Sequence, residues 1–322
     1  MPPHQAPLPS PPAPLPGVTG PKLAPFTPTA HADIEFIEFL GRENDKDSLV
    51  WKVEINGAGS FALKMFYFRH RDFLSDNQAM DLLRPLADPQ LYVDYFDPFN
   101  CECRAYGRLK EENCEDLAIK AHGYLLLTPQ QEADLAQKSE RYSTLPCSLG
   151  DTDTLDGENF WGRFEQHYGL PVRAIVKDLA SSAAYPTPTQ AQGMWADLQV
   201  LHSLGIFVKD THGGNYLTGK LVDFSRSWTM HHPAMDQIRF STIQCLMLKE
   251  LQQLLDHYYE LANLGCIDPA AIPQDLEGFC SGDIDQYKNF PFAYNWLKWS
   301  TNADVDKAYV EQSMFVFDEA AP

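Results

Sequence analysis

Short apolar runs separated by turn signals mark the first half of the chain. Each run has the length of a β-strand. They lie at 34–40, 49–55, 61–66, 119–127 and 172–179. Asn56-Gly57, between the second and third runs, is a typical hairpin turn. The first three runs therefore predict an antiparallel three-strand meander, and the last two predict further buried strands.

Helical patterns take over in the second half. Asp97 followed by Pro98 is an N-cap with proline at the first helical position, and apolar residues follow at helical spacing. After Pro188 apolar residues again share one helical face, and a long helix is predicted over about 235–264. Strands followed by helices predict an α+β chain. Two insertions interrupt the pattern, at 67–97 and about 129–170.

Composition narrows the function classes. The chain has 25 Lys+Arg against 44 Asp+Glu, a net charge of −19, so nucleic-acid phosphates would repel it. No apolar run approaches the roughly 20 residues of a membrane span, and prolines interrupt any export signal from Pro2 onward. The 7 cysteines are irregularly spaced, which is typical of free thiols. We therefore expect an intracellular protein, cytoplasmic or nuclear, that contacts neither nucleic acid nor membrane.

Proline dominates the N-terminus. Residues 1–30 hold 11 of the 24 prolines and a single charged residue, Lys22. Residues 1–31 are therefore expected to form a disordered tail that buries no apolar surface. Its proline runs would suit a polyproline-binding protein partner, although a solvated leader without a partner is the commoner interpretation.

One stretch of the second half carries candidate chemistry. Asp210 could accept a proton from an attacking hydroxyl, or orient it. Asn215, five residues later, and Asp223 offer hard oxygen ligands suited to a Mg²⁺ ion on nucleotide phosphates. The turn at Thr218-Gly219 would fold the strands between them back on each other, so that both ligands face one cleft. The plainer alternative is that these residues are loop caps and turn formers.

This stretch resembles the catalytic core of the protein-kinase-like superfamily. Leu-His-Ser-x-Gly-Ile-x-x-x-Asp-x-x-x-x-Asn, at 201–215, is similar to the passage from helix to catalytic loop, and Asp223-Phe224-Ser225 resembles Asp-Phe-Gly. The resemblance implies a two-lobed fold. A small lobe at 32–177 would hold an antiparallel sheet and one helix, and a mainly helical lobe would follow at 178–322.

The same resemblance implies an ATP site assembled from the small lobe. Lys64, in Ala62-Leu63-Lys64, would contact the phosphates and pair with Glu102. Gly41 would belong to the nucleotide-covering loop. The backbone of the hinge, including Val176 and Asp178, would hold the adenine. Lys64 could instead be an exposed strand lysine, and Glu102 a solvated helix residue.

Charge adds an argument for a metal. Glu102, Asp210 and Asp223 would repel one another unless Lys64 and Mg²⁺ offset their negative charges.

The sequence departs from the kinase pattern at two places. Acidic residues follow Gly41 where kinases carry further glycines, and no Ala-Pro-Glu follows Asp223. A phosphotransferase that uses ATP and Mg²⁺ on a small hydroxyl-bearing acceptor, in preference to a protein, is therefore the leading hypothesis.

The alternative is a catalytically inactive pseudokinase that binds proteins. The stretch Glu-Cys-Arg-Ala-Tyr-Gly-Arg-Leu at 102–109 and the run from Val208 through Asn215 to Tyr216 resemble fungal kinase-like proteins classed with an inner-kinetochore subunit family. The proline-rich tail, the missing glycines and a late aromatic cluster at 287–299 favour this alternative. It would place the protein in a nuclear assembly.

Overall fold

A five-stranded antiparallel sheet is the first element of the fold. The computed structural model describes residues 15–27, 33–41, 45, 47–69, 89–139, 160–180, 185–233 and 240–281. The sheet has the order β1-β2-β3-β5-β4. Its strands are β1 (Ile34–Phe39), β2 (Ser48–Ile55), β3 (Gly59–Phe66), β4 (Ala121–Leu126) and β5 (Arg173–Lys177). All five strands and the β2–β3 hairpin were predicted from the apolar runs.

Helices and short strands make up the rest of the described chain. The helices are α2 (Pro89–Phe96), α3 (Pro98–Glu111), α4 (Pro129–Ser139), α5 (Pro188–Ser203), α7 (Phe240–Asn263) and α8 (Gln274–Ser281). Two small antiparallel pairs are β6 (Ile206–Phe207) with β9 (Trp228–Thr229), and β7 (Tyr216–Leu217) with β8 (Lys220–Leu221). The chain is therefore α+β, as its pattern predicts.

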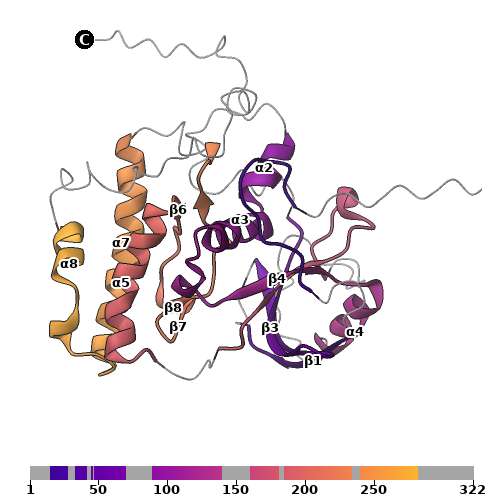
Figure 1. The fold of residues 1–322 in the computed structure, drawn as a ribbon, viewed down its shortest axis with the longest axis horizontal. Coiled ribbons are helices and arrows are strands. Elements are labelled where there is room, and N and C mark those ends of the chain that lie inside the picture. The colour runs from indigo at the N-terminus through magenta and orange to yellow at the C-terminus, as the bar shows by residue number, and fades with distance from the viewer. Residues whose placement is uncertain are drawn as a thin grey trace, which may run out of the picture.

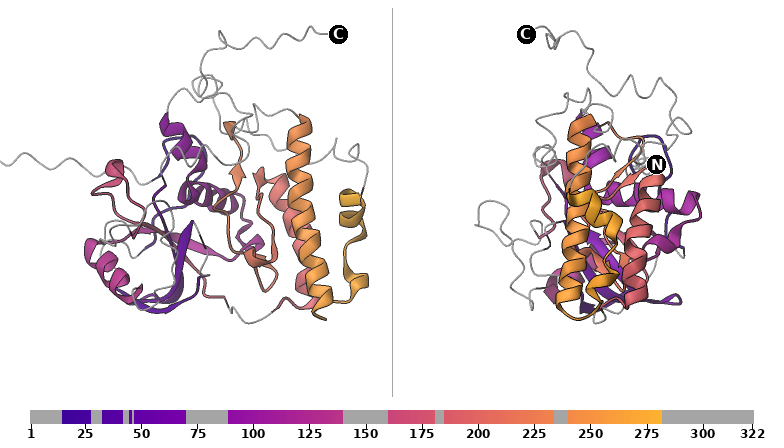
Figure 2. Two further views of the ribbon diagram at one scale, coloured as in Figure 1. Left: turned by 180° about the vertical axis from the view of Figure 1, so that it is seen from behind. Right: turned by 90° about the vertical axis from the view of Figure 1, so that its left-hand side faces the viewer.

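Helix α3 lies between the sheet and the long helices (Figures 1 and 2). The side chain of Asp97 caps it, because its Oδ1 accepts hydrogen bonds from the N–H groups of Phe99 and Asn100. Its apolar residues belong to the same core as α5 and α7, whereas β1, β2 and β4 enclose a second core. Glu102 is therefore carried by a helix that is buried along most of its length.

Part of the N-terminal segment is packed, contrary to the sequence prediction. Leu23 is only 1% exposed and Phe26 only 5%, so the expectation that residues 1–31 bury no apolar surface is wrong for 15–27. The 129–170 insertion opens with a helix, α4. Residues 70–88 of the first insertion and the aromatic cluster at 287–299 lie outside the described residues.

Candidate functional site

Lys64 lies at the centre of a buried ion cluster. Its Nζ is 2.8 Å from Oε2 of Glu102 on α3 and 2.7 Å from Oδ1 of Asp223, which follows β8. The side chain of Lys64 is 4% exposed and that of Glu102 is fully buried. The two remote stretches of chain therefore meet. An exposed lysine and a solvated glutamate, the plainer alternatives, are excluded.

Lys177, at the end of β5, is a member of the cluster that the sequence analysis missed. Its Nζ forms an ion pair with Oε1 of Glu102 and donates a hydrogen bond to the carbonyl of Val222 at 2.6 Å. In the β3–β5 register Lys177 is paired with Ala62, which shares a sheet face with Lys64. Only this long-range register brings the second lysine to the site, and no local sequence motif encodes it.

The four charges of the cluster cancel. Burial alone would lower the pKa of Lys64, but the carboxylates of Asp223 and Glu102 outweigh it and raise that pKa. Burial alone would raise the pKa of Asp223, but Lys64 and Lys177 hold it well below its usual range. For Lys177 burial prevails and lowers the pKa despite Glu102. Lys177 therefore supplies a second cation, which the charge argument for a bound metal did not include.

Asp210 and Asn215 lie in the loop between β6 and β7, next to the cluster. The side-chain amide of Asn215 donates to the carbonyl of Asp210 at 3.0 Å. The N–H of Val222 donates to the carbonyl of Asn215 at 3.0 Å, directly before Asp223. The side chain of Asp210 is 26% exposed, and its Oδ1 is 3.4 Å from Nε2 of His212. Hydrogen bonds therefore connect Asp210 to Asn215, and Asn215 to the residue directly before Asp223.

A buried glutamate of α7 holds this loop from behind. Oε1 of Glu250 accepts hydrogen bonds from the N–H groups of Val208 and Lys209, each at 2.9 Å, and its Oε2 pairs with His202 at 2.8 Å. Lys209 has a φ of 68°, which is strained for a residue with a side chain. Its Nζ lies 3.9 Å from the centre of the Trp228 ring. Burial lowers the pKa of Lys209 to about 8.

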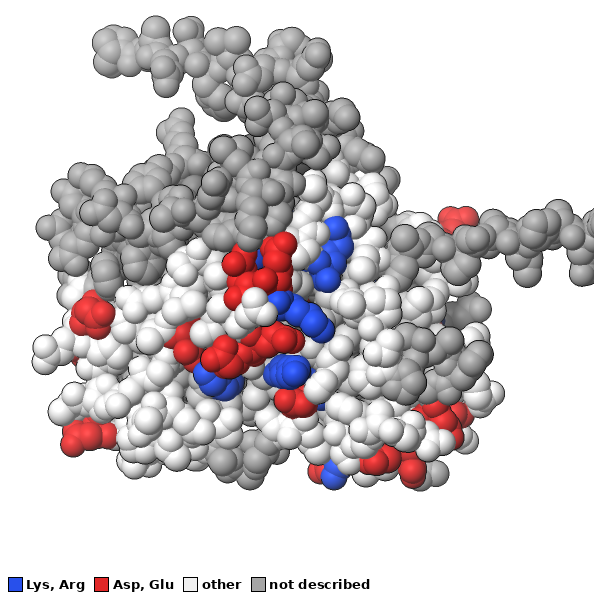
Figure 3. All heavy atoms as spheres, in the orientation of Figure 1, with Lys and Arg blue, Asp and Glu red and all other residues white. Residues whose placement is uncertain are grey.

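The acidic turn after Gly41 reaches back to the cluster. Oδ2 of Asp47 pairs with Nε of Arg226 at 3.2 Å, and its Oδ1 pairs with Arg69 at 2.8 Å. Burial raises the pKa of Asp45, and the charge of Asp223 acts in the same direction. Figure 3 shows acidic and basic side chains gathered together in the middle of one face. A carboxylate, rather than a glycine amide, therefore faces the ion cluster from this turn.

Three predicted nucleotide-binding residues take no part in the cluster. Val176 is fully buried in the sheet core, between Leu63 and Gly123 of the neighbouring strands. The N–H of Asp178 donates to the carbonyl of Lys120, and its carboxylate pairs with His122 at 2.6 Å. The N–H of Gly41 donates to the carbonyl of Val50 on β2. Nucleotide contacts at Gly41, Val176 and Asp178 stay a prediction.

The two predicted Mg²⁺ ligands, Asn215 and Asp223, each have a protein partner. Within the described residues, no group of three or more His, Cys, Asp or Glu side chains could hold a metal ion. The two predicted ligands have other partners, since Asp223 pairs with Lys64 and the amide of Asn215 bonds to Asp210. These bonds engage Oδ1 of Asp223, which also accepts a hydrogen bond from the N–H of Ser225, and the amide nitrogen of Asn215. Mg²⁺ binding at Asn215 and Asp223 stays a prediction.

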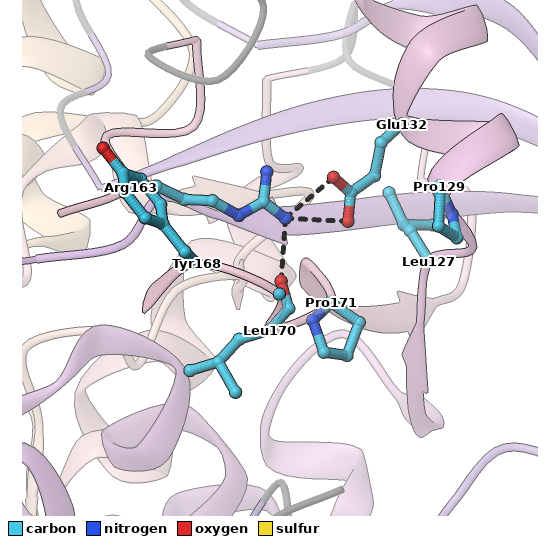
Figure 4. A pocket seen from close by; sticks show the side chains of 8 residues that line it. Leu127, Pro129, Glu132, Arg163, Tyr168, Leu170 and Pro171 are labelled. Atoms are coloured by element: carbon cyan, nitrogen blue, oxygen red, sulfur yellow. Dashed lines mark hydrogen bonds and ion pairs between the residues drawn. The ribbon is translucent and has the colours of Figure 1, made fainter. Parts of the chain in front are cut away.

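A separate hollow of about 300 Å³ lies beside α4. Arg163 spans it and pairs with Glu132 at 2.7 Å, while also donating to the carbonyl of Leu170 at 2.9 Å (Figure 4). Its lining consists of Leu127, Pro129, Glu132, Arg163, Tyr168, Gly169, Leu170 and Pro171. No member of the ion cluster lines it, and its ion pair fastens the segment after 160 to α4.

Comparison with known families identifies the chain. Residues 11–228, about two thirds of its 322 residues, match the family model described as kinetochore Sim4 complex subunit FTA2. The chain belongs to this family. No curated protein matches its sequence. The resemblance to an inner-kinetochore family is thereby confirmed, and the resemblance to kinases stays a prediction.

The FTA2 match covers the whole ion cluster and the packed N-terminal segment. It begins at residue 11, before Leu23, and ends at Trp228 in β9. Glu250, which supports the Asp210 loop, lies beyond it. Among the described residues, no helix is both long and apolar enough to cross a bilayer.

Proposed function

We propose that this chain is a non-catalytic, protein-binding subunit of a kinetochore assembly, built on a two-lobed kinase-like fold. Membership of the FTA2 family supports a nuclear location and protein partners. The fold proposal rests on an antiparallel sheet with Lys64, a helix with Glu102, and a helical part after them. The observation that carries the loss of catalysis is the buried, charge-balanced cluster completed by Lys177.

Energetics supports an inactive site. A nucleotide that took its phosphates to Lys64 would compete with Asp223, whose Oδ1 lies 2.7 Å from the Nζ of that lysine. Breaking a buried ion pair costs about 3–5 kcal/mol when one partner is left without compensation. A ligand must offset this cost before it binds with any net affinity.

The acidic turn adds a second obstacle. Its Asp47 is held by Arg226, which follows the Asp223-Phe224-Ser225 unit. A kinase turn offers backbone amides to the phosphates, whereas Asp45 and Asp47 would offer negative charge to a negatively charged ligand. The missing glycines and the added carboxylates both lower the expected affinity for ATP.

A thermal-shift titration tests the inactive site. A ligand present at about 100 times its Kd stabilises a protein by about 2.7 kcal/mol. We expect no stabilisation by ATP and Mg²⁺ together, and no difference between the unaltered chain and Asp223→Ala beyond the stability change of the variant itself. A stabilisation that needs both ATP and Mg²⁺, and is lost in Asp223→Ala, would contradict the proposal.

A substitution at Asp210 tests, in the cell of origin, whether the role of the chain depends on catalysis. Asp210 is partly exposed and its side chain is outside the buried cluster, so Asp210→Asn should leave the fold intact. We expect a fluorescently tagged Asp210→Asn chain to localise at centromeres and to support chromosome segregation as well as the unaltered chain. Loss of segregation by a folded, correctly localised variant would favour an enzyme.

The phosphotransferase remains the second candidate, because one observation favours it. The strained backbone of Lys209 directs the chain into Asp210, and hydrogen bonds tie Asp210 to Asn215 and onward to Val222. Asp210 would then orient a hydroxyl on a small acceptor. ADP formation by purified chain with a panel of small alcohols, lost in both Asp210→Asn and Asp223→Asn, would support it.

A further inference from the structure

The packed N-terminal segment, residues 15–27, is called the strap here. It runs along α3, and its course is drawn in the darkest indigo in Figure 1. The N–H of Leu23 donates to the carbonyl of Cys103 on α3 at 2.9 Å. The side chain of Leu23 enters the core that α3 shares with α5 and α7. The strap is thus bonded to the helix that carries Glu102.

The strap also adds to the edge of the sheet. Strand β4 is at the end of the strand order, so one side of it has no strand partner. The N–H of Phe26 donates to the carbonyl of Tyr124 at 2.8 Å, and the N–H of Tyr124 donates to the carbonyl of Ala24 at 3.0 Å. The strap therefore binds β4 as an added strand does, through the main chain, and Phe26 fills an apolar site beside it.

Two glycines make room for the strap. A Cβ on Gly107 of α3 would lie 2.4 Å from backbone atoms of Lys22, and a Cβ on Gly123 of β4 would lie 2.5 Å from the backbone N of Phe26. Glycine inside a helix costs about 1 kcal/mol relative to alanine. At Gly107 the close approach of the strap backbone explains why the chain accepts that cost. The groove is shaped for a main chain.

Three faces of α3 are held by three different parts of the chain. Cys103 and Gly107, four residues apart, share the face under the strap. Glu102 points to the ion cluster from a second face. Arg104 and Arg108 hold a third face by donating hydrogen bonds to the carbonyls of Leu204, Thr229, Met230 and His231. Of the three attachments, the strap is the one made by the segment that precedes β1, the first strand of the sheet.

We propose that the groove between α3 and β4 is a peptide-docking site whose resident ligand is the strap, and that its occupancy holds Glu102 against Lys64 and Lys177. The ligand class is an extended segment with apolar side chains three positions apart, here Leu23 and Phe26. The family match, which begins upstream of the strap at residue 11, supports its being part of the domain. The inference does not depend on whether the ion cluster is catalytic.

A pair of helical glycines gives a matched test in the full-length chain. Gly107→Ala should displace the strap, whereas a Cβ on Gly193 in α5 would meet nothing within 4 Å. The readout is alkylation of Cys103 by N-ethylmaleimide, located by peptide mass spectrometry. Cys103 is fully buried and burial raises its pKa well above the usual value, so it should react only when the strap leaves. Exposed Cys245 serves as the internal reference.

We expect Gly107→Ala to raise the Cys103 alkylation rate at least tenfold and Gly193→Ala to leave it unchanged. Equal rates in the two variants would overturn the proposal. Leu254→Ala removes a side chain of α7 from the same core as Leu23 but leaves the main-chain bonds of the strap to α3 and β4 in place. It controls for general destabilisation and should not expose Cys103 under native conditions.

A second variant separates docking from folding. In the full-length chain, Leu23→Asp with Phe26→Asp should undock the strap while leaving the groove intact. Adding a synthetic peptide of residues 15–27 should then restore protection of Cys103 in a saturable manner, and should lower acylation of Lys64 by an amine-reactive ester. The same peptide carrying both aspartates should do neither. If the unaltered peptide does not restore protection of Cys103, the docking site is wrong. If it restores protection of Cys103 but does not change the acylation of Lys64, the link between the strap and Glu102 is wrong.

Discussion

The Nε of Arg226 lies 3.2 Å from Oδ2 of Asp47, although 179 residues separate the two in the chain. This ion pair joins the acidic turn of the sheet to the segment that follows Asp223. The side chain of Arg226 is 48% exposed, so the pair is a surface contact that water and salt can weaken. The pair therefore holds the turn beside the ion cluster through a contact that can break and form again.

Arg226→Ala should loosen the turn without unfolding the protein. We expect faster hydrogen exchange at the amides from Asp47 to Val50, because their attachment to the segment after Asp223 is lost. The unfolding free energy should change by less than about 1 kcal/mol, as is usual for exposed pairs. Lys220→Ala removes a comparable exposed pair, with Asp197, and should leave this exchange unchanged. Unchanged exchange in Arg226→Ala would show that the turn is held by other contacts.

Lys177→Met should convert the balanced cluster into one with an excess negative charge. Removing one partner of a buried pair destabilises a protein by about 3–5 kcal/mol. The remaining carboxylates of Glu102 and Asp223 would share Lys64 alone. We therefore expect the variant, unlike the unaltered chain, to gain thermal stability on addition of Mg²⁺.

The double variant Lys177→Met with Glu102→Gln is the control for that prediction. It removes one charge of each sign, so the cluster is neutral again. Its unfolding temperature should recover part of the loss, and its response to Mg²⁺ should disappear. A Mg²⁺ response equal in the single and double variants would contradict the role of Lys177 as the balancing cation.

Asp223 should make the protein sensitive to acid. Its pKa is held below the ordinary value of about 3.9, so between the two values the unfolded chain binds more protons and stability rises with pH. The contribution is complete above about pH 5 and is lost as pH falls through the folded pKa. Urea unfolding from pH 6 to pH 3 should show the stability gap between the unaltered chain and Asp223→Asn narrowing as pH falls. A constant gap would contradict the ion pairs of Asp223.

His232 should act in a higher pH range. Burial, with a further contribution from Arg104, lowers its pKa well below the ordinary value of about 6.5. Its ring stacks on Trp228 and its Nε2–H donates to the carbonyl of Tyr95 at 3.2 Å. The neutral form is favoured by folding, so stability is present above about pH 6.5 and lost as pH falls below it.

His232→Phe should therefore be less stable at pH 8 but should lose less stability between pH 8 and pH 5.5, as measured by the unfolding temperature. Burial also lowers the pKa of His257, which makes a separate contribution. The reduction of the pH dependence should be additive in the double variant His232→Phe with His257→Phe, since the two rings stack on different partners, Trp228 and Tyr216. An unchanged pH slope in His232→Phe would exclude His232 as a source of acid sensitivity.

Local sequence signals were sufficient to predict the strands and the helix cap at Asp97. They also singled out Lys64, Glu102 and Asp223 as members of one site. Lys177 was missed because its place depends on the register between β3 and β5, which pairs residues more than a hundred positions apart. Glu250 was missed because nothing in the sequence of a long helix shows which distant backbone N–H groups donate hydrogen bonds to one of its carboxylates.

The strap was missed for a different reason. Proline content describes the average of residues 1–31, whereas docking depends on two apolar side chains, Leu23 and Phe26, and on glycines elsewhere in the chain. Gly107 in particular reads as an unfavourable residue in a predicted helix. Its purpose is visible only when the backbone of Lys22 is seen against it.

The position of Glu250 bears on how this domain can be produced. The family match stops at Trp228, but the amides of Val208 and Lys209 depend on a carboxylate that lies beyond that boundary. Leu251, Leu254 and Tyr258 follow on the same helix and are fully buried. An expression fragment cut at the family boundary would expose this apolar surface and leave two amides without acceptors, so aggregation is its expected fate. Fragments for biochemical work should continue at least through α7.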